Sequence, residues 1–131
     1  MKTLNATATA TLNRMVAMME DGYIKIDNTG GWFMPVSVEQ IFENEKYRIF
    51  SVAHYYEQNG DLMADPEMCF INLKAVGSYL PSYFKQDGIG LEQDSIVMEN
   101  GEIKGYRAKM QADHTSFANM WLRNIKNQQN I

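Results

Sequence analysis

The strongest constraint on the fold is an Asn-Gly pair that lies between two long stretches of strand-forming residues. Residues 47–58 are rich in β-branched and aromatic side chains, Asn59-Gly60 follows directly, and residues 61–73 have a similar character. An Asn-Gly pair favours the left-handed backbone of a two-residue turn, which joins neighbouring antiparallel strands. The sequence therefore predicts a long antiparallel hairpin over residues 47–73, disturbed in its second strand at Asp65-Pro66.

Shorter strand-forming stretches lie on both sides of this hairpin. A second Asn-Gly pair, Asn100-Gly101, predicts another tight turn. Because strands joined by tight turns run antiparallel, we expect one antiparallel meander of five to six strands within residues 23–108. Apart from the hairpin, its strands are expected at 23–26, 32–38 (with Pro35 at an edge or a bulge), 78–86, 91–98 and 102–108.

An amphipathic helix is expected near the N-terminus, within residues 1–21. Leu12, Val16 and Met19 recur at helical spacing, and Asp21-Gly22 is a typical end for such an element. The side chains available to cap its first turn are Thr7, Thr9 or Thr11.

A second helix is expected over residues 112–127. Phe117, Trp121 and Ile125 form an apolar stripe, Asp113 is the expected N-cap, and the Asn- and Gln-rich end is expected to fray. The predicted fold class is therefore α+β: a single domain over residues 1–131, with both helices packed on one face of the sheet.

Composition excludes several classes of protein. The chain has 131 residues, 45% hydrophobic residues and a formal charge of −4, which is ordinary for a globular protein and unlike a generic polyanion binder. The negative charge gathers in residues 41–67, which hold six acidic and two basic residues. Cys69 is the only cysteine and lies in an apolar run, so it is expected to be buried and inert. With no apolar N-terminal segment and no membrane span, a cytoplasmic protein is expected.

The hairpin also carries the candidate catalytic residues. If the pairing continues unbroken from the Asn59-Gly60 turn, His54 lies opposite Asp65, and Glu67 lies two residues further along the same strand. These three side chains would then share a polar face with Arg48, Tyr56, Gln58 and Asp61, while Ile49, Ala53, Tyr55, Leu62, Met68 and Phe70 would form a core face.

A histidine beside a carboxylate is the minimal general-base unit, so His54, Asp65 and Glu67 are the catalytic candidates. The alternative is a solvated polar face without chemistry. The pairing depends on Pro66, because a slip of one residue would move Glu67 to the other face. No metal site and no cofactor are expected, since two histidines and one cysteine are too few for zinc and the acidic spacing does not fit a calcium loop.

Two polar segments supply the candidate binding residues. Tyr56, Gln58 and Asp61 come from the hairpin. Tyr83, Gln86 and Asp87 come from a second segment, whose Gly88 and Gly90 indicate a turn rather than a phosphate loop. The tyrosines could stack on bases, but the surrounding negative charge does not favour nucleic acid.

Three motifs resemble those of an uncharacterised bacterial domain family of plasmids, phages and conjugative elements. The first is the run from Ser51 to Met63 followed by Asp65-Pro66-Glu67-Met68; the second is Pro81-x-Tyr83-x-x-Gln86-Asp87-Gly88; the third is Ser116-Phe117-Ala118 to Trp121-x-x-Asn124. The resemblance covers about residues 30–127. It implies a bacterial cytoplasm and a mobile-element setting, and it brings no established activity.

Three functional hypotheses follow. The first is an accessory module that binds a protein partner through the polar face of the 47–73 hairpin. The second is a small metal-assisted or general-base enzyme that acts on nucleic acid or nucleotide through His54, Asp65 and Glu67. The third is an acidic mimic of nucleic acid, for which a charge of −4 is small. The first hypothesis is preferred.

Overall fold

The computed structural model describes residues 1–131 and contains two helices, a six-stranded antiparallel sheet and a separate two-stranded hairpin. The predicted α+β meander with a helix at each end is confirmed. The helices are α1 (Ala6–Ala17) and α2 (Ala108–Gln129), with a short 3₁₀ turn η1 (Asp87–Ile89). The strands are β1 (Tyr23–Ile26), β2 (Val36–Glu43), β3 (Tyr47–Gln58), β4 (Asp61–Leu73), β5 (Tyr79–Gln86), β6 (Leu91–Asp94), β7 (Ile96–Glu99) and β8 (Glu102–Tyr106).

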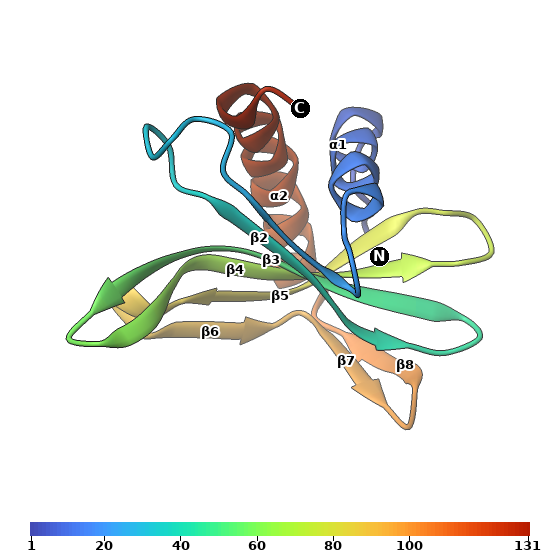
Figure 1. Ribbon diagram of the computed structural model, residues 1–131. Helices are drawn as coiled ribbons and strands as arrows, with labels where there is room; N and C mark the ends of the chain where they lie inside the picture. The colour runs from blue at the N-terminus through green and yellow to red at the C-terminus, as the bar shows by residue number, and fades with distance from the viewer.

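The elements form layers around the six-stranded sheet, whose strands β1 to β6 lie in chain order. Figure 1 shows α1 and α2 side by side over one face of this sheet, and the β7–β8 hairpin beneath the other. We call the first face the helix-covered face and the second the helix-free face. Side chains alternate between the two faces along each strand.

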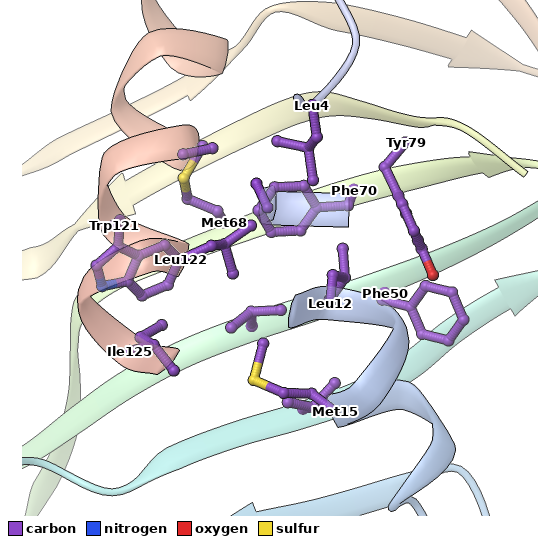
Figure 2. Close-up of a cluster of buried hydrophobic side chains, with 14 of the residues drawn as sticks. Leu4, Leu12, Met15, Phe50, Met68, Phe70, Tyr79, Trp121, Leu122 and Ile125 are labelled. Carbon is purple, nitrogen blue, oxygen red and sulfur yellow. The ribbon is translucent and has the colours of Figure 1, made fainter. Parts of the chain in front are cut away.

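The main core lies between the helices and the helix-covered face. Phe50, Met68 and Phe70 from the sheet meet Leu12 of α1 and Leu122 of α2, as Figure 2 shows. A smaller apolar cluster of Ile71, Leu80 and Ile96 lies on the opposite side, between the sheet and the β7–β8 hairpin. Each face therefore has an apolar layer, but the second layer covers only part of the helix-free face.

Helix α1 begins before the threonines that were expected to cap it. Asn5 is its N-cap, because the side-chain oxygen of Asn5 accepts a hydrogen bond from the backbone N–H of Ala8 at 2.9 Å. The prediction of Thr7, Thr9 or Thr11 as N-cap is wrong, since all three lie inside the helix.

Helix α2 also differs from its prediction at both ends. It begins at Ala108, directly after Arg107, so the expected cap at Asp113 is wrong. At its C-terminal end the helix continues to Gln129, whose side chain is fully buried, although fraying was predicted there. Gln129 is held by the loop between β1 and β2, which is too distant in the sequence for local patterns to reveal.

The expected strand over residues 91–98 is broken at Ser95. The backbone N–H of Ser95 donates to the carbonyl of Ser82 at 2.9 Å, and its buried hydroxyl lies 2.9 Å from Nδ1 of His114. Strand β6 ends before this residue, and β7 leaves the main sheet after it. These contacts with β5 and α2 create a two-stranded hairpin below the sheet.

Candidate functional site

The long hairpin has the expected turn but not the expected register. Gln58 pairs with Asp61 and Tyr55 with Ala64, as the Asn-Gly turn predicts. Beyond this point one extra residue enters β4, so Ala53 pairs with Glu67. The bulge lies at Asp65-Pro66, where proline cannot donate to the ladder. The predicted pairing of His54 with Asp65 is wrong, and so is the assignment of His54 and Glu67 to one face.

His54 lies on the helix-covered face, in the core. Its Nδ1 donates to the carbonyl of Pro35 at 2.9 Å, and its ring lies edge-on to Trp121 with centroids 5.5 Å apart. The imidazole is buried, at 7% exposure. This histidine therefore joins the β2 strand start to α2.

Asp65 takes part in a clamp that fixes the bulge. Its carboxylate accepts a hydrogen bond from the Gln86 side chain at 3.1 Å, and the Asp87 carboxylate accepts from the backbone N–H of Ala64 at 2.8 Å. Asp87 also lies 3.6 Å from the ammonium group of Lys85. Gln86 and Asp87, both predicted binding residues, thus supply hydrogen-bond partners to the polar groups of Asp65 and Ala64 at the β4 bulge.

The remaining predicted binding residues are dispersed. Gln58 and Asp61 are exposed and flank the Asn59-Gly60 turn. Tyr56 is half-buried, and its hydroxyl lies close to the backbone of Gly88, 3.3 Å from where a Cβ there would lie. Tyr83 lies on the helix-free face, on the strand next to Glu67.

The three catalytic candidates do not converge on one site. His54 bonds to Pro35, Asp65 to Gln86 and Glu67 to Ser51.

The helix-free face contains two neighbouring hollows. The first, which we call the tyrosine hollow, has a volume of about 440 Å³ and lies over β1, β2 and β3. Two serines, Ser37 and Ser51, and three tyrosines are among its lining residues. The complete lining of the tyrosine hollow is Tyr23, Lys25, Pro35, Ser37, Glu39, Ser51, Tyr55, Tyr56, Glu57 and Leu62.

The second hollow, which we call the hairpin pocket, has a volume of about 640 Å³ and lies between the sheet and the β7–β8 hairpin. Eight of its twelve lining residues are hydrophobic. The other four are the polar residues Glu67, Ser82, Asp94 and Arg107. The pocket thus has mostly apolar walls, and its charged side chains are two carboxylates and one guanidinium.

Ser51 and Glu67 connect the two hollows. Ser51 lines the tyrosine hollow and Glu67 lines the hairpin pocket, and the serine hydroxyl donates to the glutamate carboxylate at 2.5 Å. A hydrogen bond to an ionised acceptor is stronger than a neutral one, so this bond holds the Glu67 carboxylate in place.

Carboxylates outnumber cations on the helix-free face. Glu39 and Glu57 line the tyrosine hollow, Glu67 and Asp94 line the hairpin pocket, and Glu92 accepts a hydrogen bond from Tyr83 at 2.8 Å. The cations on this face are Lys25, Lys85 and Arg107. None of the five carboxylates forms an ion pair, because the four ion pairs of the chain use Glu43, Asp87, Glu102 and Asp113.

Burial and the neighbouring carboxylates raise the pKa of three groups on this face. Burial, together with the charge of Glu67, raises the pKa of Tyr55 to about 12. Burial, reinforced by Glu67 and Asp94, raises the pKa of the Cys69 thiol to about 12. Tyr83 has a raised pKa because of burial and its hydrogen bond to Glu92. These groups therefore stay protonated at neutral pH, and the Tyr83 hydroxyl donates to Glu92.

Several residues of this face were absent from the predicted site, and the assignment of Tyr55 to the core face is wrong, because Tyr55 lines the tyrosine hollow. Ser37, Ser51, Tyr55 and Asp94 lie in strands that alternate on both faces, so the pattern did not distinguish the open face. The available signal was Pro66, because a bulge there moves Glu67 to the face of Ser51. No group of three or more histidine, cysteine or acidic side chains is arranged to hold a metal ion.

A family model described as "Domain of unknown function (DUF6908)" matches residues 6–131. The expectation of an uncharacterised domain family is confirmed, and the match includes α1, which the resemblance did not cover. No curated protein and no solved structure matches the chain. Neither helix has the length and apolar character needed to cross a membrane.

Proposed function

Because the chain belongs to this family, whose description assigns no activity, we propose its function from the geometry: a module that binds a basic segment of a protein partner on its helix-free face. The observation that carries the proposal is the set of five carboxylates without ion pairs around two adjoining hollows. An acidic surface attracts and orients a partner of opposite charge.

The shape of the face also supports binding of a protein segment. Tyrosines combine apolar area with a hydroxyl and are enriched at protein interfaces. Tyr23, 45% exposed, and Tyr55 border the tyrosine hollow. Ile41, 50% exposed, and Val97, 39% exposed, line the hairpin pocket. These apolar groups, with the carboxylates beside them, suit a partner with lysine or arginine side chains.

The geometry offers less to the two other hypotheses. A general base with a supporting carboxylate needs His54, Asp65 and Glu67 together, yet each is engaged separately. A mimic of nucleic acid needs a dense acidic surface, whereas this face also carries three cations. The binding module is therefore the function that this geometry supports best.

The direct experiment is a titration of the ¹⁵N-labelled full chain with a decalysine peptide, monitored by NMR. We expect amide shifts at helix-free residues such as Ser37, Ser51 and Tyr55, and weaker binding as salt screens the charges. A decaglutamate peptide and a neutral Gly-Ser decapeptide serve as controls. Shifts confined to α1 and α2, or equal binding of decaglutamate, would overturn the proposal.

A matched pair of double variants tests the role of the carboxylates. Glu39→Gln with Glu57→Gln removes two charges from the tyrosine hollow, and we expect decalysine to bind about three- to tenfold more weakly, since an exposed charge pair contributes up to ~1 kcal/mol. Glu20→Gln with Glu45→Gln removes two exposed charges outside both hollows. Equal losses in the two double variants would mean that net charge, not this face, determines binding.

The cellular setting is a further part of the proposal. The motifs at Ser51–Met63 and Pro81–Gly88 resemble a bacterial family of plasmids, phages and conjugative elements, which supports a role in the cytoplasm as an accessory protein of a mobile element. A basic partner encoded on the same element would be the natural candidate for the binding assay.

A further inference from the structure

We infer that the hairpin pocket holds a cationic group on an aliphatic stem, that is, one lysine or arginine side chain of the partner. The inference rests on the proposed function and names the anchor of that interaction. A few well-enclosed side chains supply most of the free energy of protein association, and pockets are where such anchors bind. The hairpin pocket, at about 640 Å³, has room for a long side chain.

The walls of the pocket suit the methylene groups of such a side chain. Ile49 and Ile71 line it from the sheet, and Ile96, Val97 and Met98 line it from β7. Lysine and arginine bury their methylene stems against apolar surface while their charged ends remain near polar groups. A short polar or acidic side chain would leave these apolar walls in contact with water.

The carboxylates of the pocket suit the charge of such a side chain. Glu67 is half-buried, and its carboxylate is oriented by Ser51 and forms no ion pair. Asp94 lines the same pocket, and the charges of both carboxylates act on Cys69, which lies in the lining. A cation placed here would therefore meet two carboxylates that lack a basic partner.

The basic groups nearby are already engaged. Arg107 donates from its Nη1 to the backbone carbonyl of Asp94 at 2.7 Å, not to the Asp94 carboxylate. Lys85 is the cross-strand neighbour of Glu67, but its ammonium group pairs with Asp87 at 3.6 Å. Neither cation forms an ion pair with Glu67 or Asp94, so the pocket has two carboxylates against the one guanidinium of Arg107, and this net negative charge suits a cation from the partner.

The test uses single amino-acid probes with blocked termini and the full chain labelled at its methyl groups. N-acetyl-lysine methylamide and N-acetyl-arginine methylamide carry the cation, and the norleucine analogue carries only the stem. We expect the cationic probes to shift the methyl signals of Ile71, Ile96 and Met98, and the norleucine probe to bind at least about tenfold more weakly. The better binder of the two cations identifies the anchor as lysine or arginine.

Variants separate the pocket from the rest of the face. Glu67→Gln keeps an oxygen that can accept from Ser51 but removes the charge, so the cationic probes should bind about tenfold more weakly. Val97→Trp should block the pocket, because Val97 lines it and is 39% exposed. Glu99→Gln, on the same hairpin but outside this pocket, is the control and should leave binding unchanged.

The outcomes distinguish the inference from the proposed function. If norleucine binds as well as lysine, or if Glu67→Gln and Val97→Trp leave the cationic probes unaffected, the inference is wrong. If decalysine still binds the helix-free face in that case, the proposed function stands without this anchor. If decalysine fails to bind while the cationic probes occupy the pocket, the pocket is a site for a small cation and the docking function is wrong.

Discussion

Replacing Gln129 by alanine tests whether the C-terminal end of α2 is a structural anchor. The Gln129 side chain accepts from the backbone N–H of Asn28 at 2.8 Å and donates to the carbonyl of Met34 at 3.1 Å. Its backbone carbonyl accepts from the Asn28 side chain at 2.9 Å. The Gln129 side chain is fully buried, whereas Asn28 is exposed and Met34 is half-buried, so water has partial access to the partners of Gln129.

The expected loss follows from the groups that the substitution leaves behind. Without the amide, the Asn28 N–H and the Met34 carbonyl lose their partners, and a polar group left unsatisfied away from water costs about 1–3 kcal/mol. Allowing for partial access of water, we expect the free energy of unfolding to fall by about 2–4 kcal/mol. With an unfolding entropy of roughly 2.1 cal/mol/K per residue, this lowers Tm by about 7–15 °C.

Urea unfolding of the variant measures this loss, with Asn127→Ala as the control, since Asn127 is exposed and two residues away. Hydrogen exchange at the Asn28 amide should accelerate in the Gln129 variant only. A loss below about 0.5 kcal/mol, or an equal loss in the control, would refute the reasoning and place the helix end among the fraying segments.

Three further predictions concern single side chains. Burial lowers the pKa of His114 below its ordinary 6.5, so the unfolded chain takes up the proton first and the free energy of unfolding falls as pH drops through 6.5. In urea titrations at about pH 8 and about pH 5.5, the His114→Asn variant should lack the decrease in the free energy of unfolding that His114 causes. If the variant loses as much stability as the wild type, the prediction is wrong. Because the Cys69 thiol has a pKa of about 12, a thiol reagent at about pH 8 should modify the folded chain at least about 100-fold more slowly than the unfolded chain; equal rates would exclude this. Trp32 is 89% exposed, so Trp32→Ala should change the free energy of unfolding by less than about 0.5 kcal/mol, whereas Trp121→Ala in the core should lower it by about 3–5 kcal/mol in the same urea assay.

The location of the candidate site was only partly predictable. The hairpin with its Asn59-Gly60 turn was predicted correctly. The error arose from one residue, because a bulge at Pro66 reverses which face every later residue of β4 occupies. His54 was therefore placed with the carboxylates, whereas its ring packs on Trp121.

The second polar segment shows a different limit of sequence patterns. Gln86 and Asp87 were predicted to bind a partner because they are polar and neighbour a turn. Their hydrogen bonds instead reach Asp65 and Ala64, more than twenty residues away. A polar side chain needs a hydrogen-bond partner, but the sequence does not show whether that partner is a ligand or another part of the chain.

The sequence by itself determined the local geometry. Asn59 and Asn100 adopt the positive φ that their turns require, both at 53°, each followed by a glycine with positive φ. Those turns place neighbouring strands antiparallel, and the apolar stripe with Trp121 and Ile125 produces the buried face of α2. These features depend on residues within a few positions of one another, so local chemistry is sufficient.

Only the tertiary structure decided which face the helices cover and which carboxylates remain free. Phe50 faces the helices and Ser51 faces away, although both lie in a strand whose two faces are largely buried near its middle. The bulge then brings Glu67 beside Ser51. The contacts of Ser95 separate β7 from β6, and β7 then forms one wall of the hairpin pocket. Each of these outcomes depends on contacts between distant segments. The free energy that selects them comes from packing and hydrogen bonds that no short stretch of the chain contains.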